Sequence, residues 1–258
     1  MSEIFNLTRF GKLFIKHTAE HYKSYLMSLT VLVGVMVLGG SFIIFIIPGG
    51  FLDLQIQSSM FVIILMLAGT IFTSTIFTDF GNKNKAIASL TLPASHFEKY
   101  LVAWLYSFVL FIVVFTCSFY LILAFLTSLR HLPGQKTVFL DVFHRPVGFQ
   151  VILLFALLHA IAFYGAILFE KLHFIKTAFA FFIFVAFLIF FNKTLLGILL
   201  GRDVMPAAPF TNARFMEHSK GITISTTGIE ESHIIIPMLV LTLLFWVAAY
   251  FRLKEKQV

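Results

Sequence analysis

The sequence lacks the groups from which most enzymes and nucleotide-binding proteins build their sites. Charged residues make up only 12% of the 258 residues, and Cys117 is the single cysteine. One cysteine forms neither an intrachain disulfide nor a cysteine metal centre. The chain also has no G-x-x-x-x-G-K-[ST], no G-x-S-x-G and no H-E-x-x-H. These absences exclude a Walker phosphate loop, the nucleophile turn of the serine hydrolases and the helix of the common zinc proteases.

Long uncharged stretches make up most of the chain. Hydrophobic residues account for 59% of the sequence, and six stretches carry no charge or almost none. A helix needs about 20 apolar residues to cross a hydrocarbon core about 30 Å thick, and backbone groups in lipid must bond to one another. The sequence therefore predicts an all-α membrane protein with a single transmembrane domain over residues 1–258. The six predicted spans cover approximately residues 25–47, 58–78, 95–128, 149–169, 174–200 and 234–251.

Positive charge is distributed unevenly between the two sides of these spans. Twelve Lys and Arg residues lie on the side of the two termini, and six lie on the opposite side. Because cytoplasmic loops carry the excess of Lys and Arg, we expect both termini in the cytoplasm. The richness in phenylalanine and lysine favours a bacterial cytoplasmic membrane. The net charge of +7 follows from this distribution and does not indicate nucleic-acid binding.

Residues 3–23 have the pattern of an amphipathic helix. Charged side chains three or four apart share one face, and apolar side chains share the opposite face. A basic amphipathic helix beside a span is expected to lie in the plane of the cytoplasmic headgroups. The charged face consists of Arg9, Lys12, Lys16, Glu20 and Lys23, and the apolar face of Ile4, Leu7, Phe10, Phe14 and Tyr22.

The segment between spans two and three, residues 79–95, interrupts the apolar pattern in a specific way. Residues 86–92 favour a short helix, which Pro93 ends. Ser95 and Glu98 then match the S-x-x-E capping box that begins a helix. We therefore expect a short cytoplasmic helix, a proline break and a capped start of the third span.

The few polar side chains inside the spans each have a structural and a functional interpretation. Thr70, Thr73 and Ser74 of span two bond within the helix packing or line a polar path. His159 is the one ionisable residue deep in a span, so it is a functional group or a neutral imidazole bonded to a neighbouring helix. Lys193, near the outer end of span five, lines the path or extends its ammonium group to the interface.

The sequence His17-Thr-Ala-Glu20-His21 matches the H-x-x-E-H order of the inverted zinc proteases. The match lies before the first span, and no distant acidic residue stands out as a further ligand. We therefore favour histidines beside the headgroup layer over a zinc site, and we expect this chain to hold no metal or cofactor.

The order of these features resembles the ABC-2 type permeases, the membrane subunits of one class of ABC exporters. The stretch NKNKAIASLTLPASHFEKYLVAWLYS is similar to the family's segment after span two, where a short helix leads to a Leu-Pro-x-Ser step and an acidic-basic pair. The residues that match this step are Leu92, Pro93, Ser95, Glu98 and Lys99. The sequence differs from the family where Asn82, Lys83, Asn84 and Lys85 replace acidic residues often found there.

The resemblance implies a role for each part of the chain. Residues 3–23 would be a connecting helix, spans two and five would border the path, and residues 201–232 would form an external gate. The segment 79–95 would hold a coupling helix that docks on a separate ABC-type ATPase, which binds ATP and Mg. The permease would pair with a second copy or a related permease. The candidate coupling residues are Lys83, Lys85, Ala88, Leu92, Pro93, Ser95 and Glu98.

Two other classes of function remain open at this point. A non-transporting membrane scaffold or assembly subunit would be equally apolar and equally free of catalytic motifs. A membrane enzyme would use His159 or the pair His17 and His21. For an exporter, the scarcity of charge in the spans favours a lipid-like, amphiphilic or peptide cargo over a small ion.

Overall fold

A computed structural model gives the fold of the chain. It describes residues 5–46, 52–76, 94–129, 138–142, 146–169, 171–207, 209, 213–217, 220–224 and 232–255. Among these residues, six helices are long and apolar enough to cross a membrane, which confirms the predicted number of spans and a multi-pass membrane protein. Most of the predicted coupling segment lies outside the described residues, including Lys83, Lys85, Ala88, Leu92 and Pro93.

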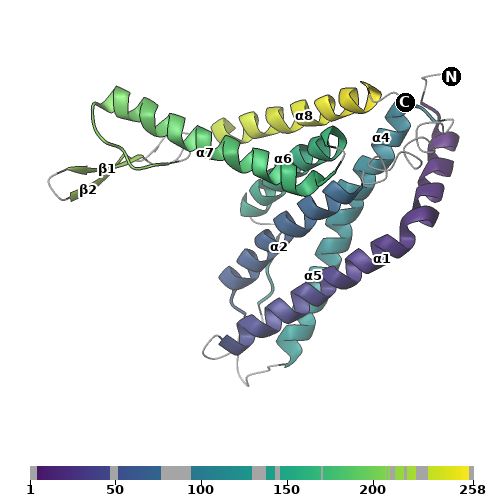
Figure 1. Cartoon of the computed structure of the whole chain (residues 1–258). Helices are drawn as coiled ribbons and strands as arrows, with labels where there is room; N and C mark the ends of the chain where they lie inside the picture. The colour runs from purple at the N-terminus through teal and green to yellow at the C-terminus, as the bar shows by residue number, and fades with distance from the viewer. Residues whose placement is uncertain are drawn as a thin grey trace.

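The six spans alternate in direction along the chain (Figure 1). They are formed by α1 (Leu7–Ile46), α2 (Leu54–Thr75), a third span of three consecutive segments, α6 (Pro146–Leu168), α7 (His173–Leu200) and α8 (Ser232–Glu255). The third span consists of α4 (His96–Trp104), the π-helical segment η2 (Leu105–Leu110) and α5 (Phe111–Leu129). As a result, α1 and α4 begin, and α8 ends, at one end of the molecule, which we call the terminal end (Figure 1).

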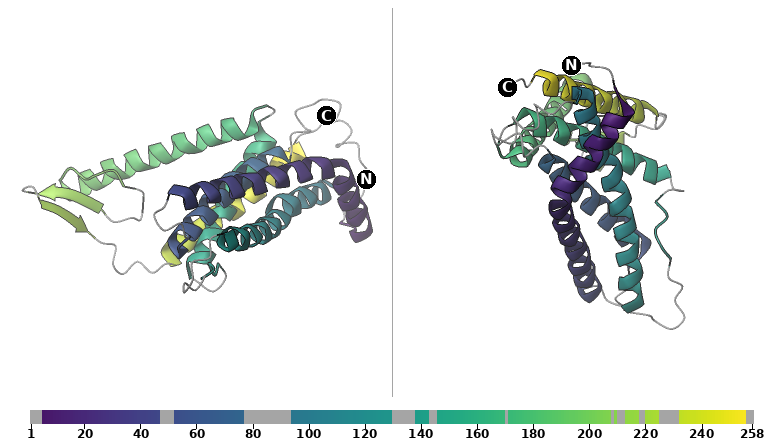
Figure 2. Two further views of the ribbon diagram at one scale, coloured as in Figure 1. Left: turned by 90° about the horizontal axis from the view of Figure 1, so that it is seen from below. Right: turned by 90° about the vertical axis from the view of Figure 1, so that its right-hand side faces the viewer.

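The predicted connecting helix is not a separate element. From Leu7 to Ile46 the chain forms one continuous helix of 40 residues, whereas we had expected an interfacial helix over residues 3–23 and a span from about residue 25. The helix bends near its N-terminal end, so that its first turns run in a different direction from the rest (Figures 1 and 2). The chain thus changes direction within a helix and not at a break between two helices.

Close packing of α2, the third span, α6 and α8 forms the interior. Gly69 of α2 lies against Phe155 of α6, and a Cβ atom on this glycine would come within 2.2 Å of the Phe155 ring. A Cβ atom on Gly165 of α6 would likewise come within 1.9 Å of the hydroxyl oxygen of Thr177 in α7. Small residues at such contacts let the helix backbones approach closely, and van der Waals packing holds helices together in lipid.

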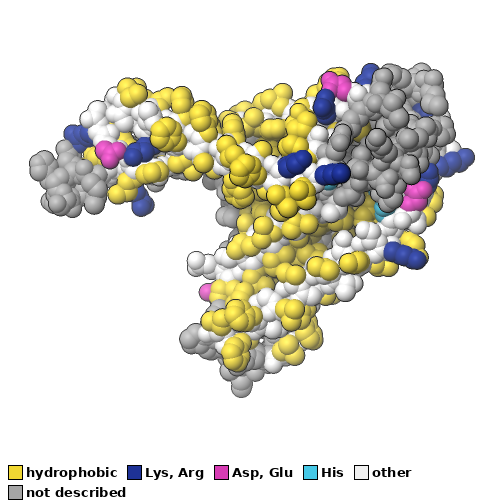
Figure 3. Space-filling model, in the orientation of Figure 1, with side chains coloured by type: hydrophobic (Ala, Val, Ile, Leu, Met, Phe, Trp, Pro, Cys, Tyr) yellow, Lys and Arg dark blue, Asp and Glu magenta, His cyan; other side chains and the backbone are white. Residues whose placement is uncertain are grey.

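The two neighbours α6 and α7 differ most in how much they are covered. Of the residues in the apolar stretch of α6, 56% are buried inside the protein, compared with only 6% in the apolar stretch of α7. Helix α7 projects from the other spans and carries the hairpin of β1 (Ala213–Glu217) and β2 (Lys220–Ile224) at its far end (Figure 1). On the face drawn in Figure 3, hydrophobic side chains cover the helices along their lengths, and Lys and Arg gather near their ends.

The hairpin lies within the predicted external loop, residues 201–232. Its strands pair antiparallel, with Phe215 opposite Ile222, and Val204 forms a further bridge to Phe215. The β-branched residues of the stretch that begins at Gly221 suit a strand.

Candidate functional site

The start of the third span is a capped helix end, as predicted. The Ser95 hydroxyl accepts a hydrogen bond from the backbone N–H of Glu98 at 3.2 Å, and the Glu98 carboxylate accepts one from the N–H of Ser95 at 3.0 Å. This is the capping box that the sequence indicated. It places the Glu98 carboxylate at the first turn of α4.

Glu98 also binds the beginning of α1, which the sequence did not indicate. The guanidinium of Arg9 donates two hydrogen bonds, from Nε to Oε2 and from Nη2 to Oε1, both at 2.7 Å. The N–H of Asn6 donates a further bond to Oε1 at 2.9 Å. The Asn6 side chain in turn accepts from the N–H groups of Thr8 and Arg9 at the first turn of α1. We call the group Asn6, Arg9, Ser95 and Glu98 the terminal junction.

The buried charge in the terminal junction is fully hydrogen-bonded, and its partner charge is partly exposed. The Glu98 side chain is fully buried, whereas that of Arg9 keeps 28% of its surface exposed. Burying a carboxylate costs free energy unless the carboxylate is paired and hydrogen-bonded. Both oxygens of Glu98 accept hydrogen bonds, from the Arg9 guanidinium and from two backbone N–H groups. Because the two planar groups meet through two parallel bonds, they fix the direction of α1 relative to α4.

A second buried polar site lies in the middle of the bundle, around His159 of α6. The indole N–H of Trp246 in α8 donates to Nδ1 of His159 at 3.1 Å. Because the indole only donates, Nδ1 carries no proton, and the neutral ring donates from Nε2 to the hydroxyl of Ser107 at 2.9 Å. Ser107, in η2, donates to the carbonyl oxygen of Ala103 at 2.8 Å. We call these four residues the His159 chain.

The geometry of His159 fits a neutral imidazole that is bonded to neighbouring helices. Its ring is completely buried, and both of its nitrogens have partners. The chain of donors runs in one direction, from indole to imidazole to hydroxyl to carbonyl, so it is complete with a neutral imidazole. His159 therefore joins α6, α8 and η2 through uncharged hydrogen bonds.

The hydroxyls of span two bond within their own helix. Thr70, Thr73 and Ser74 donate to the carbonyl oxygens of Met66, Gly69 and Thr70 respectively, at 2.7 to 2.8 Å. Thr73 and Ser74 are buried, which suits helix packing, since such bonds satisfy the hydroxyl donors locally. Lys193 forms an ion pair with Asp203 at 3.3 Å near the far end of α7.

The histidines of α1 face the protein interior more than the sequence indicated. His17 is half-buried, forms a 2.6 Å hydrogen bond with the hydroxyl of Tyr25 and packs 4.8 Å from the ring of Tyr106 in η2. The Thr18 hydroxyl also bonds to that of Tyr106. Within the part of the chain that the structure describes, no three acidic, histidine or cysteine side chains are placed to hold a metal ion.

At the end opposite the terminal junction, a short segment is held by side-chain amides and hydroxyls. We call residues 138–142 the strap. The side-chain amide nitrogen of Gln57 in α2 donates to the Val138 carbonyl oxygen, and the Gln57 amide oxygen accepts from the Leu140 N–H. Tyr120 of α5 donates to the Leu140 oxygen at 2.7 Å. Gln57 is almost fully buried, so its neutral amide satisfies the strap's backbone groups without a charge.

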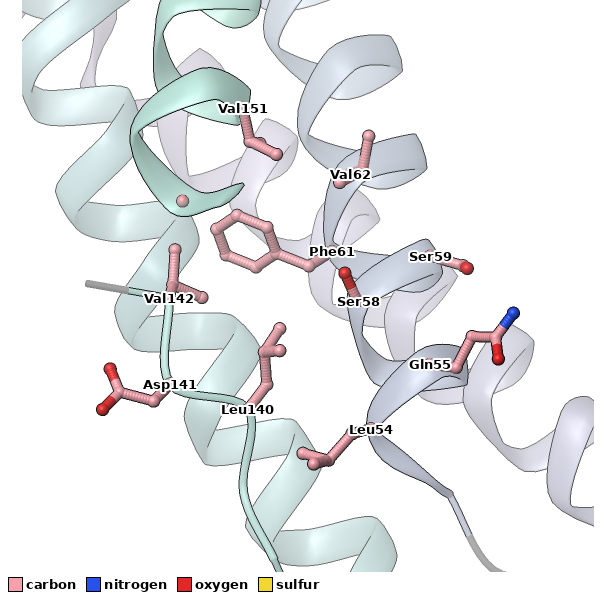
Figure 4. A pocket seen from close by; sticks show the side chains of 11 residues that line it. Leu54, Gln55, Ser58, Ser59, Phe61, Val62, Leu140, Asp141, Val142 and Val151 are labelled. Carbon is pink, nitrogen blue, oxygen red and sulfur yellow. The ribbon is translucent and has the colours of Figure 1, made fainter. Parts of the chain in front are cut away.

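The strap borders a hollow of about 380 Å³ between α2 and the first turns of α6 (Figure 4). Ser58 and Phe61 point from α2 towards the strap, whereas Gln55 and Ser59 point the opposite way (Figure 4). Gly148 is required here, since a Cβ atom would lie 1.7 Å from the Val142 carbonyl oxygen.

The terminal junction and the His159 chain each join helices through hydrogen bonds, and in the His159 chain the Ser107 hydroxyl accepts from the imidazole and donates to a backbone oxygen. Two residues of the terminal junction, Ser95 and Glu98, were indicated by the sequence, and Asn6 and Arg9 were not. No protein-family model matches the chain, and no curated protein or solved structure matches it either.

Proposed function

We propose that this chain is the permease subunit of an ATP-driven exporter in a bacterial cytoplasmic membrane, with the ATPase on a separate chain. The terminal end would face the cytoplasm. The proposal rests on the resemblance of residues 82–107 to the ABC-2 type permeases and on the position of the terminal junction. A lipid-like, amphiphilic or peptide cargo fits the scarcity of charge in the spans.

The observation that carries the proposal is the buried Glu98 at the point where the chain re-enters the membrane. The segment before it contains the coupling candidates Lys83, Lys85 and Ala88, and Glu98 binds both the cap of α4 and the first turn of α1. A displacement of the coupling segment would therefore move two spans together. This is the arrangement that a permease without its own nucleotide site needs.

Energy would come from the partner. ATP and Mg would bind to the ATPase subunits, and their closure would displace the coupling segments of two permease chains. ATP drives alternation only if the permeases' two conformations bind the closed ATPase with different affinities. This displacement would reach the third span through the short connection that contains Leu92, Pro93 and Ser95.

The test is affinity purification of the tagged chain from its native membrane in mild detergent, with mass spectrometry of the retained proteins. The proposal predicts a stoichiometric ATPase with a Walker loop. The double variant Lys83→Glu/Lys85→Glu should lose this ATPase while the chain stays folded. Lys171→Glu, a matched charge reversal in the exposed turn before α7, should retain it.

Two results would contradict the proposal. If the wild-type chain retains only itself or other membrane proteins, under conditions that preserve known transporter complexes, the chain is a scaffold or assembly subunit. If the double variant transports and binds ATPase as well as wild type, the coupling segment does not have the role assigned to it.

A further inference from the structure

The third span is two α-helices in different registers, joined by one π-helical turn. Its buried residues include five at a spacing of four, namely Ala103, Ser107, Phe111, Phe115 and Phe119. In an α-helix each residue turns by about 100°, so a run at spacing four drifts by about 40° per step and by about 160° from the first to the last. The π turn contains roughly one extra residue, which removes about 100° of this drift.

Each half of the span is fixed to a different part of the molecule. The α4 half is held by the terminal junction and by the hydroxyl of Tyr100, which donates to the backbone oxygen of Trp246 at 3.0 Å. The α5 half is held by packing, since the rings of Phe115 and Phe119 lie 5.2 and 5.1 Å from that of Phe61 in α2. It is also held by the bond from Tyr120 to the strap, which a rotation of α5 would break. The π turn is where these two registers meet.

The His159 chain lies at that turn. The Ser107 hydroxyl of η2 accepts a hydrogen bond from Nε2 of His159, and the rings of Phe108 and His159 lie 5.0 Å apart. Ser107 then donates to the Ala103 oxygen, four residues back, inside the last turn of α4. A side chain on another helix thus holds the residue at which the helical register changes.

We propose that the third span is a register switch, in which η2 converts between the π form held by His159 and an α form that turns α5 relative to α4. In the α form each residue of α5 would take the angular position now held by the next residue. Val114 would replace Phe115 against α2, and Ser118 would replace Phe119. The rotation of α5 would be about 100°, one residue of an α-helix.

Lipid makes the second register accessible. The face that would turn inward contains Val114, Leu121 and Phe125, which are exposed in the present register. Because lipid chains are as apolar as these side chains, the exchange of faces changes helix packing but exposes no apolar surface to water. The one polar residue moved inward, Ser118, can bond back to its own helix. The switch does not depend on the proposed transport function, although a rotating span would serve it.

The chain contains a natural reporter of this rotation. Cys117, the single cysteine, lies on the exposed face of α5, beyond η2. A 100° rotation would carry a side chain around a helix of about 10–12 Å diameter, which is a displacement of roughly 8 Å. A spin label on Cys117, paired with one on Leu244→Cys on the exposed face of α8, would measure it.

The experiment compares variants of the full-length chain in lipid nanodiscs by pulsed electron spin resonance. With His159 intact we expect one main distance between the labels. His159→Leu removes both bonds of the ring, and a second distance, shifted by several ångströms, should appear. His159→Gln can still accept from Trp246 and donate to Ser107, so it should restore the single distance.

A deletion separates the switch from simple misfolding. Removing Val109, an exposed residue of η2, takes out the extra residue while both halves keep their present faces. The Val109 deletion should therefore fold with the wild-type distance and should keep it when combined with His159→Leu. A single wild-type distance in His159→Leu alone would overturn the proposal, and so would a changed distance in the deletion variant. Labels on Leu67→Cys and Leu244→Cys, with Cys117→Ser, are the control and should not move.

Discussion

The terminal junction and the His159 chain are two buried polar sites that join helices in different ways. The junction uses a full charge pair, with Glu98 buried and Arg9 partly exposed, at the end of the bundle where α1 and α4 begin. The His159 chain uses only uncharged groups in the middle of the bundle, where His159 and Ser107 are buried and Trp246 is partly buried.

The difference shows how depth in the bundle selects the chemistry of a joint. A charged pair at the end of a span keeps part of its solvation, so a carboxylate and a guanidinium can meet there without leaving an unpaired buried charge. In the middle of the bundle, donors and acceptors must be matched one to one, which the indole, imidazole and hydroxyl do. The junction thus keeps one partly exposed charge, on Arg9, whereas the His159 chain contains no charge.

The largest effect is expected from breaking the junction on its basic side. Arg9→Ala leaves the Glu98 carboxylate buried with only backbone N–H donors, and an uncompensated buried charge is the most costly outcome of a single substitution here. Arg9→Lys keeps the charge but loses the two parallel bonds, so its effect should be smaller. The midpoint of thermal unfolding in detergent should fall in the order wild type, Arg9→Lys, Arg9→Ala. Equal midpoints would show that Arg9 does not stabilise Glu98.

A disturbance of packing beside the His159 chain should rank second. The Cβ atom of Gly69→Ala would press on the Phe155 ring, which stacks at 5.8 Å on Phe108 of η2. Overpacking of this kind costs about 1–3 kcal/mol in free energy of unfolding. Gly34→Ala, with no atom within 4 Å of the new methyl group, is the matched control and should be neutral or slightly stabilising. Reversible unfolding of both proteins in detergent would measure the difference, and similar values would contradict the close contact.

Breaking the neutral site should have a smaller effect on stability. His159→Leu removes two hydrogen bonds between helices, and such bonds in membranes contribute about 0.6 kcal/mol each on average and at most about 1.7. We therefore expect a loss of about 1–2 kcal/mol in free energy of unfolding, most of it restored in His159→Gln. A loss as large as that of Arg9→Ala would mean that the two joints do not differ as argued.

The smallest effect is expected at an exposed ion pair, which sharpens the contrast with the buried one. Lys193 and Asp203 are 3.3 Å apart, but Asp203 is 91% exposed. Exposed pairs contribute about 0–1 kcal/mol. Lys193→Ala should therefore leave the unfolding free energy unchanged within about 0.5 kcal/mol, and a larger loss would indicate a further role for Lys193.

The number of spans and the cap of the third span could be predicted from the sequence, because apolar length and the S-x-x-E spacing are local signals. The partner of Glu98 could not, since Arg9 shares a helical face with four other charged residues and only the tertiary fold turns it inward. The register change in the third span had a readable signal in the run of Ala103, Ser107, Phe111, Phe115 and Phe119, but spacing alone does not distinguish a π turn from a rotating face. The continuous helix α1 was not predicted, because the change from a charged to an uncharged sequence after Lys23 suggested two separate helices. The backbone continues as one helix through this change.

The most direct test of the account measures how much ATPase stays bound to three purified chains: wild type, Arg9→Ala and His159→Leu. Only the folded, monodisperse fraction of each is compared, per mole of chain. If the terminal junction positions the coupling segment, wild type and His159→Leu should retain the ATPase and Arg9→Ala should retain much less. Equal retention by all three, or an ATPase on none of them, would contradict the account.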